Sequence, residues 1–438
     1  MKKKVLSLTK FYLNWSLISV LVGVACGIAS AIFLTSLAKA TETREHYQWL
    51  HYLLPLGGLI VGYLYHIWGK SVEGGNNLII DEFHDPQKVV PIRMAPLVLL
   101  GTVATHLFGG SAGREGTAVQ MGGSIADQFT HFFKLNRKER RTLLMIGMSG
   151  GFGSVFGVPF AGTMFGLEVL AIGKLHLHGL FQCAISAFVA HYVTTALGVH
   201  HTAYLHPLID LPLNIVVVGS LICAGLGFGL AARLFAFLVS HISKISKSFI
   251  GYLPIRIFTG GVLISIIFYL IPAATRYAGL GVPVIVNSIQ EPVFYYDWFW
   301  KLVLTALTLG MGFKGGEVTP LLFIGATLGN AMSSYLPISL PILSAVGFVG
   351  VFAGAANTPF ACTIMAMELF GVQIGSFAAI AAFSSYLISG HHGIYSSQKI
   401  HIEKSKYASR TMELISFIFN WPNSNKGKIK KPKSDGHS

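Results

Sequence analysis

Residues 159–168 read PFAGTMFGLE, and residues 359–368 read PFACTIMAME. Both follow the pattern P-F-A-x-T, four further residues and then Glu, and each comes directly after a glycine-rich run, SGGFGSVFGV or VGVFAGAANT. Some 42 to 44 residues before each proline lies a glutamate flanked by glycine, Glu115 in GREGT and Glu317 in KGGEVTP. The same signals therefore recur in the same order in two halves of the chain, which indicates a duplication.

The composition indicates a membrane protein. Of the 438 residues, 53% are hydrophobic and only 11% are charged, whereas soluble domains carry about 25% charged residues. The apolar run 15–38 is long enough to cross roughly 30 Å of hydrocarbon, whereas 319–336 is short and interrupted. The 49 glycines allow helices to pack closely and to break inside the protein. We therefore predict an all-α polytopic membrane fold with broken and re-entrant helices.

The distribution of charge predicts the orientation of the halves. The net charge of +14 is concentrated near the two ends of the chain, in MKKKVLSLTK and NKGKIKKPKS, which predicts that both termini are cytoplasmic in an inner-membrane protein. The basic loop KLNRKERR (134–141) has the uncharged counterpart SYLPISLP (334–341) in the second half. Such a contrast is expected of inverted repeats. A basic soluble domain, which nucleic-acid binding would require, is not predicted.

The same signals divide the chain into segments. We expect a cytoplasmic N-terminal segment, two membrane repeats, a C-terminal amphipathic helix and a disordered basic tail, without a soluble regulatory domain. Their predicted bounds are 1–14, 15–210, 211–397, 398–420 and 421–438.

Glycine-flanked helix starts inside a membrane are candidate anion sites, because unpaired N–H groups and the positive end of the helix dipole meet there. Three such starts are GGNN (74–77), GREGT (113–117) and GGEVTP (315–320), and GIYSSQ (393–398) adds a tyrosine. An ionised Glu115 would occupy such a site and a protonated Glu115 would leave it, which would couple anions to protons. The alternative is a helix-start acid that binds local amides or Arg114.

The motifs resemble one family. GREGT with the following AVQMGGSIAD, the two PFA…E blocks and GIYSSQ are similar to the CLC family of chloride channels and transporters, over about 15–415. The resemblance implies a gating glutamate at Glu115 and an anion site lined by Tyr395. It also implies a homodimer with one pathway in each subunit.

Several residues depart from the chloride-handling members of that family. Asn76 stands where those members have a serine, Thr117 replaces a proline, and Val318 and Thr319 lie in the second loop. Val169 stands where proton-coupled chloride members carry an internal glutamate. These departures resemble the fluoride/proton antiporter branch. Fluoride is strongly hydrated, so its site needs strong hydrogen-bond donors.

The sequence therefore predicts a fluoride/proton antiporter that exports cytoplasmic fluoride, with a chloride/proton antiporter or a passive anion channel as alternatives. No HExxH motif is present, so we predict neither an enzyme nor a bound cofactor or metal. Several assignments remain open: Asn77 is an alternative to Asn76, Glu317 either lies on the pathway or pairs with Lys314, and Glu168 and Glu368 are expected to share a structural role. The predicted anion-site residues are Asn76, Gly113, Arg114, Gly116, Thr117, Val318, Thr319 and Tyr395.

Overall fold

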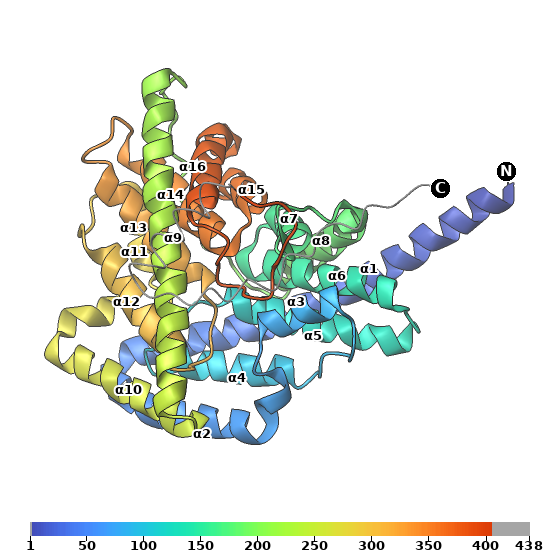
Figure 1. Ribbon diagram of the computed structural model, residues 1–438, viewed down its shortest axis with the longest axis horizontal. Helices are drawn as coiled ribbons and strands as arrows, with labels where there is room; N and C mark the ends of the chain where they lie inside the picture. The colour runs from blue at the N-terminus through green and yellow to red at the C-terminus, as the bar shows by residue number, and fades with distance from the viewer. Residues whose placement is uncertain (1, 405–438) are drawn as a thin grey trace.

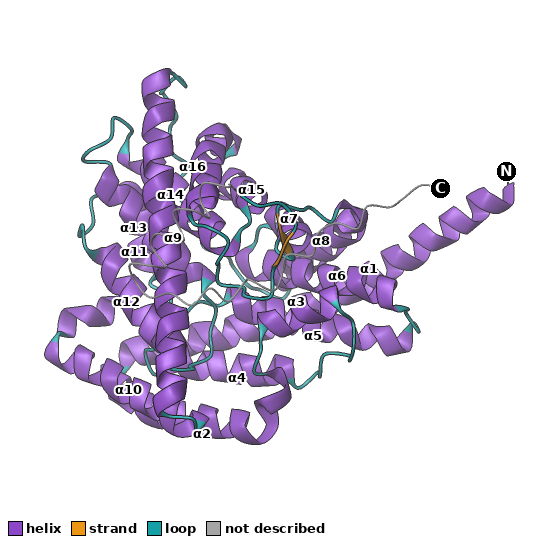
Figure 2. Cartoon of the chain, viewed as in Figure 1, coloured by secondary structure: helices purple, strands orange, loops and turns teal. Residues whose placement is uncertain are grey.

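Helices make up most of the described part of the protein (Figures 1 and 2). The computed structural model describes residues 2–404. The first half contains α1 (Lys2–His46), α2 (Leu54–Leu64), α3 (Asn76–His84), α4 (Met94–Leu107), α5 (Glu115–Phe132), α6 (Arg137–Phe156), α7 (Pro159–Glu168) and α8 (Leu180–Ala196). The second contains α9 (Ile215–Phe249), α10 (Leu253–Leu270), α11 (Val282–Gln290), α12 (Asp297–Gly310), α13 (Val318–Met332), α14 (Leu340–Ala356), α15 (Pro359–Phe370) and α16 (Gly375–Ile388). Short helical turns are η1 (Gln48–Leu53), η2 (Tyr65–Gly69), η3 (Lys70–Val72), η4 (Leu177–Gly179), η5 (Pro272–Tyr277) and η6 (Val372–Ile374), and the strands are β1 (Ala171–Ile172) and β2 (Lys399–Ile400).

The two halves match helix by helix. The packed pairs α5–α6, α1–α8 and α6–α8 recur as α13–α14, α9–α16 and α14–α16. The helices α3 and α11 both have nine residues, and α4 and α12 both have fourteen. Most helices of the first half lie to the right in Figure 1 and most of the second to the left. The predicted boundary at 210 falls in the segment without helix between α8 and α9.

The repeated PFA…E blocks show how the halves are related. Glu168 ends α7 and accepts hydrogen bonds from the amides of Phe360 and Ala361 at the start of α15 (3.0 and 2.7 Å). Glu368, near the end of α15, accepts the amides of 160–161 in the same way (2.9 and 2.7 Å). Each glutamate thus satisfies amides at the start of the other helix, where no carbonyl of its own helix can reach them. The expected shared structural role of the two glutamates is confirmed.

This reciprocal arrangement also fixes the orientation of the repeats. The two helices must lie antiparallel, because the last turn of each reaches the first turn of the other. A two-fold axis perpendicular to both helices exchanges them. This arrangement is the one expected of the predicted inverted repeats.

Glycine brings the main helix pairs into close contact in both halves. A Cβ on Gly122 of α5 would collide with the carbonyl oxygen of Gly147 on α6, and a Cβ on Gly325 of α13 would collide with that of Gly347 on α14. These backbones touch directly, as in tightly packed membrane helices. Both α5 and α13 begin at the two glutamate loops, residues 113–117 and 315–319, so these contacts help to fix where the loops lie.

The membrane-spanning character agrees with the composition. By length and hydropathy, four helical stretches of the described chain can cross a membrane, namely Tyr12–His46, Gln48–His84, Ile215–Phe249 and Leu253–Leu270. Several other apolar helices have only 10–17 residues, as expected of broken helices.

The C-terminal helix predicted over 398–420 does not begin at 398. Residues Lys399–Ile400 instead form β2, which pairs in parallel with β1. A backbone hydrogen bond from the amide of His401 to the carbonyl of Ile172 continues this pairing. The remainder of the predicted helix and the tail lie outside the described residues.

Candidate functional site

The two glutamate loops meet inside the protein. Gly113 and Gly316 pair as an isolated antiparallel bridge, with N–H···O distances of 2.6 and 2.8 Å. Glycine is needed at this contact, because a Cβ on Gly316 would lie 2.8 Å from the nitrogen of Gly116. The bridge brings the start of α5 beside the start of α13. Two helix N-termini, one from each repeat, therefore face the same small region.

Glu115 is the first residue of α5 and is fully buried. Its carboxylate accepts hydrogen bonds from the Thr319 hydroxyl, 2.8 Å from Oε1 and 2.6 Å from Oε2, and from the Thr319 amide at 3.0 Å. The Arg114 amide lies 3.3 Å from Oε2, and Arg114 Nε lies 3.4 Å from Oε1. The arginine contact expected as the alternative is thus present, but it is longer than the bonds to Thr319. A residue of the second repeat holds the carboxylate of the first.

The two loops contain three further predicted site residues, Gly116, Thr117 and Val318. Val318 and Thr319 form the first turn of α13 and are both buried. Gly116 leaves room beside Asn76 and Glu317, since a Cβ there would lie 3.3 Å from Asn76 Nδ2 and 3.2 Å from Glu317 Oε2. The Thr117 hydroxyl points elsewhere and pairs with the Thr102 hydroxyl at 2.7 Å. The side chain of Thr117 therefore supports the loop and does not bind Glu115.

Close to the glutamate loops lies a group of buried polar atoms that have no hydrogen-bond partner among the described residues. Asn76 is 6% exposed and Tyr395 is 3% exposed. Asn76 Oδ1, the Tyr395 hydroxyl and Glu317 Oε2 have no hydrogen-bond partner among the described residues. All three residues line one cavity of about 200 Å³. Buried polar groups are rarely left unpaired, so this cavity is suited to water or an ion.

The structure distinguishes between the two adjacent asparagines. Asn76 is the first residue of α3 and faces the glycine of the glutamate loop. Asn77 instead accepts a hydrogen bond from the amide of Ser397 through its Oδ1 (3.0 Å), which ties α3 to the segment that carries Tyr395. Both asparagines line the cavity, but of the two side-chain oxygens only that of Asn76 is buried without a partner among the described residues.

The expected alternative partner of Glu317 is wrong. The Lys314 ammonium lies over the ring of Tyr65, 4.0 Å from its centroid, and no ion pair joins it to Glu317 among the described residues. Sequence reasoning also missed that Lys314, Lys247 and Arg256 line the cavity together with Glu73. Spacing gives no signal for this grouping, because the four residues come from four separate segments.

Sequence reasoning also missed the buried Arg140. It is 5% exposed and donates to Asp127 on α5 (two bonds of 2.7 Å), to Glu82 on α3 (2.9 Å) and to the Lys88 carbonyl (2.6 Å). The helices α3 and α5, which begin at Asn76 and Glu115, are thereby joined near their other ends. The run KLNRKERR predicted only a basic loop, although its Arg140 is buried.

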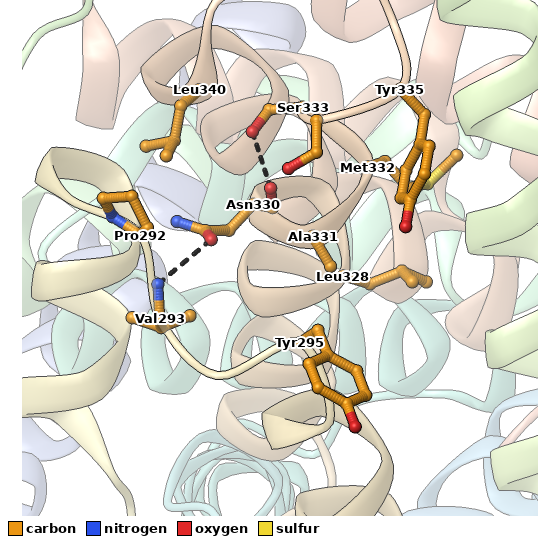
Figure 3. Close-up of a pocket in the computed structure, with 11 residues that line it drawn as sticks. Pro292, Val293, Tyr295, Leu328, Asn330, Ala331, Met332, Ser333, Tyr335 and Leu340 are labelled. Carbon is orange, nitrogen blue, oxygen red and sulfur yellow. Dashed lines mark hydrogen bonds between the residues drawn. The ribbon is translucent and has the colours of Figure 1, made fainter.

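Another cavity, of about 440 Å³, lies elsewhere (Figure 3). Exposed Tyr295 and Tyr335 stand at its sides, and the Asn330 amide is occupied by backbone groups: its Oδ1 accepts from Val293, and its Nδ2 donates to the carbonyls of Ser288 and Glu291. None of the described residues that line this cavity is charged. It therefore lacks the groups that an ion site needs.

Fold and site together define a class: an integral membrane protein of two inverted repeats whose broken helices meet at a buried carboxylate, as in ion transporters and channels. The profile of the family described as "Voltage gated chloride channel" matches residues 57–390, and the chain belongs to this CLC family.

Individual relatives agree. The "Chloride/fluoride channel protein" of Pseudomonas syringae pv. tomato is 51% identical over 400 residues, which cover 90% of this chain and 88% of the relative. The H(+)/Cl(-) exchange transporter ClcA of Vibrio cholerae serotype O1 is 24% identical, over 80% of this chain and 81% of the relative. The crystal structure of a CLC-type fluoride/proton antiporter matches with a TM-score of 0.86 and 37% identity, covering 89% of this chain and 98% of that one. The resemblance drawn from the motifs is confirmed, and these relatives are transporters or channels rather than enzymes.

Proposed function

We propose that the protein is a fluoride/proton antiporter that exports cytoplasmic fluoride in exchange for protons, with Glu115 as the gating and proton-carrying residue. The observation that carries this proposal is the Glu115 carboxylate. It is fully buried between two helix N-termini and is held by the hydroxyl and amide of Thr319. A negative group already occupies a place built for an anion, so the carboxylate and a free anion compete for it. Protonation of Glu115 removes its charge and releases the place.

The choice of fluoride rests on the available donors. Fluoride gives up strong hydration, so it needs short, strong hydrogen bonds in return. The Thr319 hydroxyl and amide, the Asn76 amide nitrogen and the Tyr395 hydroxyl supply donors within the site and its cavity. The similarity to a chloride/fluoride channel protein and to a fluoride/proton antiporter supports the same choice.

The test uses purified protein in potassium-loaded liposomes, with fluoride efflux started by valinomycin and followed by an ion-selective electrode. External pH and chloride efflux are followed in parallel. Fluoride efflux with opposing proton movement is expected, and Glu115→Gln should abolish the proton movement. The exposed Glu42 provides the control, since Glu42→Gln makes the same chemical change away from the site.

Two outcomes would contradict the proposal. Chloride efflux as fast as fluoride efflux would favour the chloride/proton antiporter. Fluoride efflux without proton movement would favour a passive channel.

The assembly and placement of the protein are part of the same proposal. We infer a homodimer with one pathway in each subunit, placed in the inner membrane with both termini in the cytoplasm. The basic N-terminal segment and the basic run 134–141 support this orientation. Cross-linking of the reconstituted protein and labelling of single cysteines from each side of the membrane test the two statements.

A further inference from the structure

Tyr395 lies in a stretch without helix, residues 389–398, between the end of α16 and the start of β2. No helix therefore fixes the direction of its side chain, although the residue is buried and lines the cavity of about 200 Å³. Its hydroxyl has no hydrogen-bond partner among the described residues, so no bond at the tip of the side chain holds it either. The position of the hydroxyl thus depends on what holds the backbone of this stretch.

Tyr395 and Gln398 are the two ends of one turn. The amide of Gln398 donates to the carbonyl of Tyr395 at 3.3 Å, which closes a four-residue β-turn. Gln398 is buried, but it is not among the described residues that line the cavity. It therefore does not face the cavity itself. Instead it fixes one end of the turn whose other end carries Tyr395.

The side chain of Gln398 joins the ends of two helices from different repeats. Its Nε2 donates to the carbonyl of Val169, directly after α7, at 2.7 Å, and to the carbonyl of Ala356, the last residue of α14, at 2.8 Å. The last carbonyls of a helix have no partner within that helix, and a glutamine amide has two N–H donors. One side chain therefore satisfies a carbonyl at the end of each helix.

Asn357 holds the oxygen of the same amide. Its Nδ2 donates to Gln398 Oε1 at 2.8 Å, and both residues are buried. Asn357 follows α14 with a φ of +61°, in the left-handed region that asparagine enters more readily than most residues. Both N–H donors and the oxygen of the Gln398 amide are thus occupied, which favours one orientation of this side chain.

Two single hydrogen bonds add to this anchor. The amide of Ile394 donates to a carbonyl in the last turn of α14 at 2.9 Å, and the amide of Ser397 donates to Asn77 Oδ1 at 3.0 Å. These bonds lie on either side of Tyr395, and each supplies one contact. The side chain of Gln398 supplies three, so it is the largest single anchor among the hydrogen bonds of this stretch.

We propose that Gln398 is a positioning residue: it caps α7 and α14 together, and in this way holds the turn that keeps the Tyr395 hydroxyl at the cavity. The helix α14 packs against α13, whose first turn contains Thr319, the partner of Glu115. Gln398 thereby places the Tyr395 donor relative to the helix pair that holds the Glu115 carboxylate. The inference rests on the proposed function in one respect, namely that the transported anion accepts a hydrogen bond from this hydroxyl.

The test measures fluoride efflux from liposomes at a series of internal fluoride concentrations, with the full chain. Tyr395→Phe removes the hydroxyl and should raise the fluoride concentration for the half-maximal rate about tenfold or more, because a hydrogen bond to an anion is lost. Gln398→Met keeps a side chain of similar size without the amide. It should raise that concentration roughly three- to tenfold, since the hydroxyl is displaced and not removed. The exposed Gln373 provides the control, because Gln373→Met makes the same chemical change and should alter nothing.

Two readouts separate positioning from mere structural support. A purely structural role would lower the amount of folded protein, and hence the maximal rate, at an unchanged half-maximal concentration. Positioning should instead raise the half-maximal concentration while the maximal rate per folded protein changes less than about twofold. If Gln398 acts through Tyr395, Gln398→Met should raise the half-maximal concentration less than about twofold in the Tyr395→Phe background.

A milder variant keeps the inference testable if Gln398→Met folds poorly. Asn357→Gly retains a left-handed backbone and removes only the donor to Gln398 Oε1, so it should raise the half-maximal concentration roughly two- to fivefold. An unchanged half-maximal concentration in the variant that folds would overturn the inference. An effect of full size in the Tyr395→Phe background, or no effect of Tyr395→Phe alone, would overturn it as well.

The two proposals can fail separately. If the wild-type protein releases chloride and not fluoride, or moves fluoride without protons, the proposed function fails. The same set of variants, measured with the anion that is transported, then still decides the inference. If fluoride/proton exchange is observed but the effects of Gln398→Met and Tyr395→Phe are additive, the proposed function stands and the inference fails.

Discussion

The reciprocal contacts between α7 and α15 give the sharpest prediction about stability. Glu168 is 5% exposed, and its two carboxylate oxygens accept the amides of Phe360 and Ala361 at 3.0 and 2.7 Å. In Glu168→Gln one oxygen still accepts an amide, but the side-chain NH₂ group now faces the other amide. A buried N–H donor is left without an acceptor, and the charge of the carboxylate is lost from the helix N-terminus.

The magnitude follows from that geometry. One unsatisfied buried donor costs about 1–3 kcal/mol, and the lost interaction with the helix dipole adds about 0.5 kcal/mol. We therefore expect the free energy of unfolding to fall by about 1.5–3.5 kcal/mol. Melting temperature shifts by about 1–2 °C per kcal/mol in a chain of this size, extrapolated from smaller proteins. The expected decrease in Tm is about 1.5–7 °C.

The symmetry of the fold provides an internal comparison. Glu368 makes the equivalent contacts but is only half-buried, so Glu368→Gln should lower Tm by about half as much. Thermal unfolding in detergent, followed by the fraction that remains monodisperse on size exclusion, measures both variants beside Glu42→Gln. A Tm for Glu168→Gln equal to that of wild type would refute the reasoning. A larger decrease in Tm for Glu368→Gln than for Glu168→Gln would also refute it. Loss of proton movement in Glu168→Gln at unchanged Tm would refute it too, because Glu168 would then be a proton carrier.

Three further predictions follow from the site and its supports. Thr319→Val removes the hydroxyl that holds the buried Glu115 carboxylate and should slow coupled efflux roughly tenfold or more, because one charge-assisted hydrogen bond is lost. Thr319→Ser keeps the hydroxyl and should retain most of the rate, so equal rates in the two variants would contradict this prediction. Arg140→Gln breaks a buried ion cluster and should destabilise the protein by about 3–5 kcal/mol, seen as a lower Tm, whereas exposed Arg137→Gln should stay within about 0.5 kcal/mol. Gly325→Ala drives a Cβ into the facing backbone of α14 and should lower Tm or abolish folding, whereas Gly219→Ala, with open space around it, should be tolerated.

The outline of the fold was predictable because it rests on composition and repetition. The two PFA…E blocks revealed the duplication, and the contrast between 134–141 and 334–341 revealed the inversion. Repeated motifs and the distribution of charge can both be read directly from the sequence. The cross-contacts of Glu168 and Glu368 were predicted only as a shared role, since their partners lie about 200 residues away in the chain.

The site was predictable in part for the same reason. Glu115 and Thr319 each stand in a glycine-rich motif, so their helix starts were visible, but the bond between them depends on how the repeats fold together. The sequence could not distinguish Asn76 from Asn77, because the Ser397 amide that donates to Asn77 Oδ1 lies 320 residues further along the chain. The group around Arg256 could not be predicted, because its members come from the turn after η3, from α9, from α10 and from the loop before α13, and no local pattern joins them.

The two halves carry the same short motif but use it differently. GREGT and GGEVT place a glutamate two residues before a threonine in each repeat. In the second repeat Thr319 binds Glu115, and Glu317 Oε2 is left unpaired. In the first repeat Thr117 pairs with Thr102 instead of Glu317. The duplication therefore supplied two equivalent acids, and packing made them unequal. Two ionised carboxylates in one small buried region repel each other strongly, and the packing separates their roles: Thr319 holds Glu115, whereas Glu317 faces the cavity.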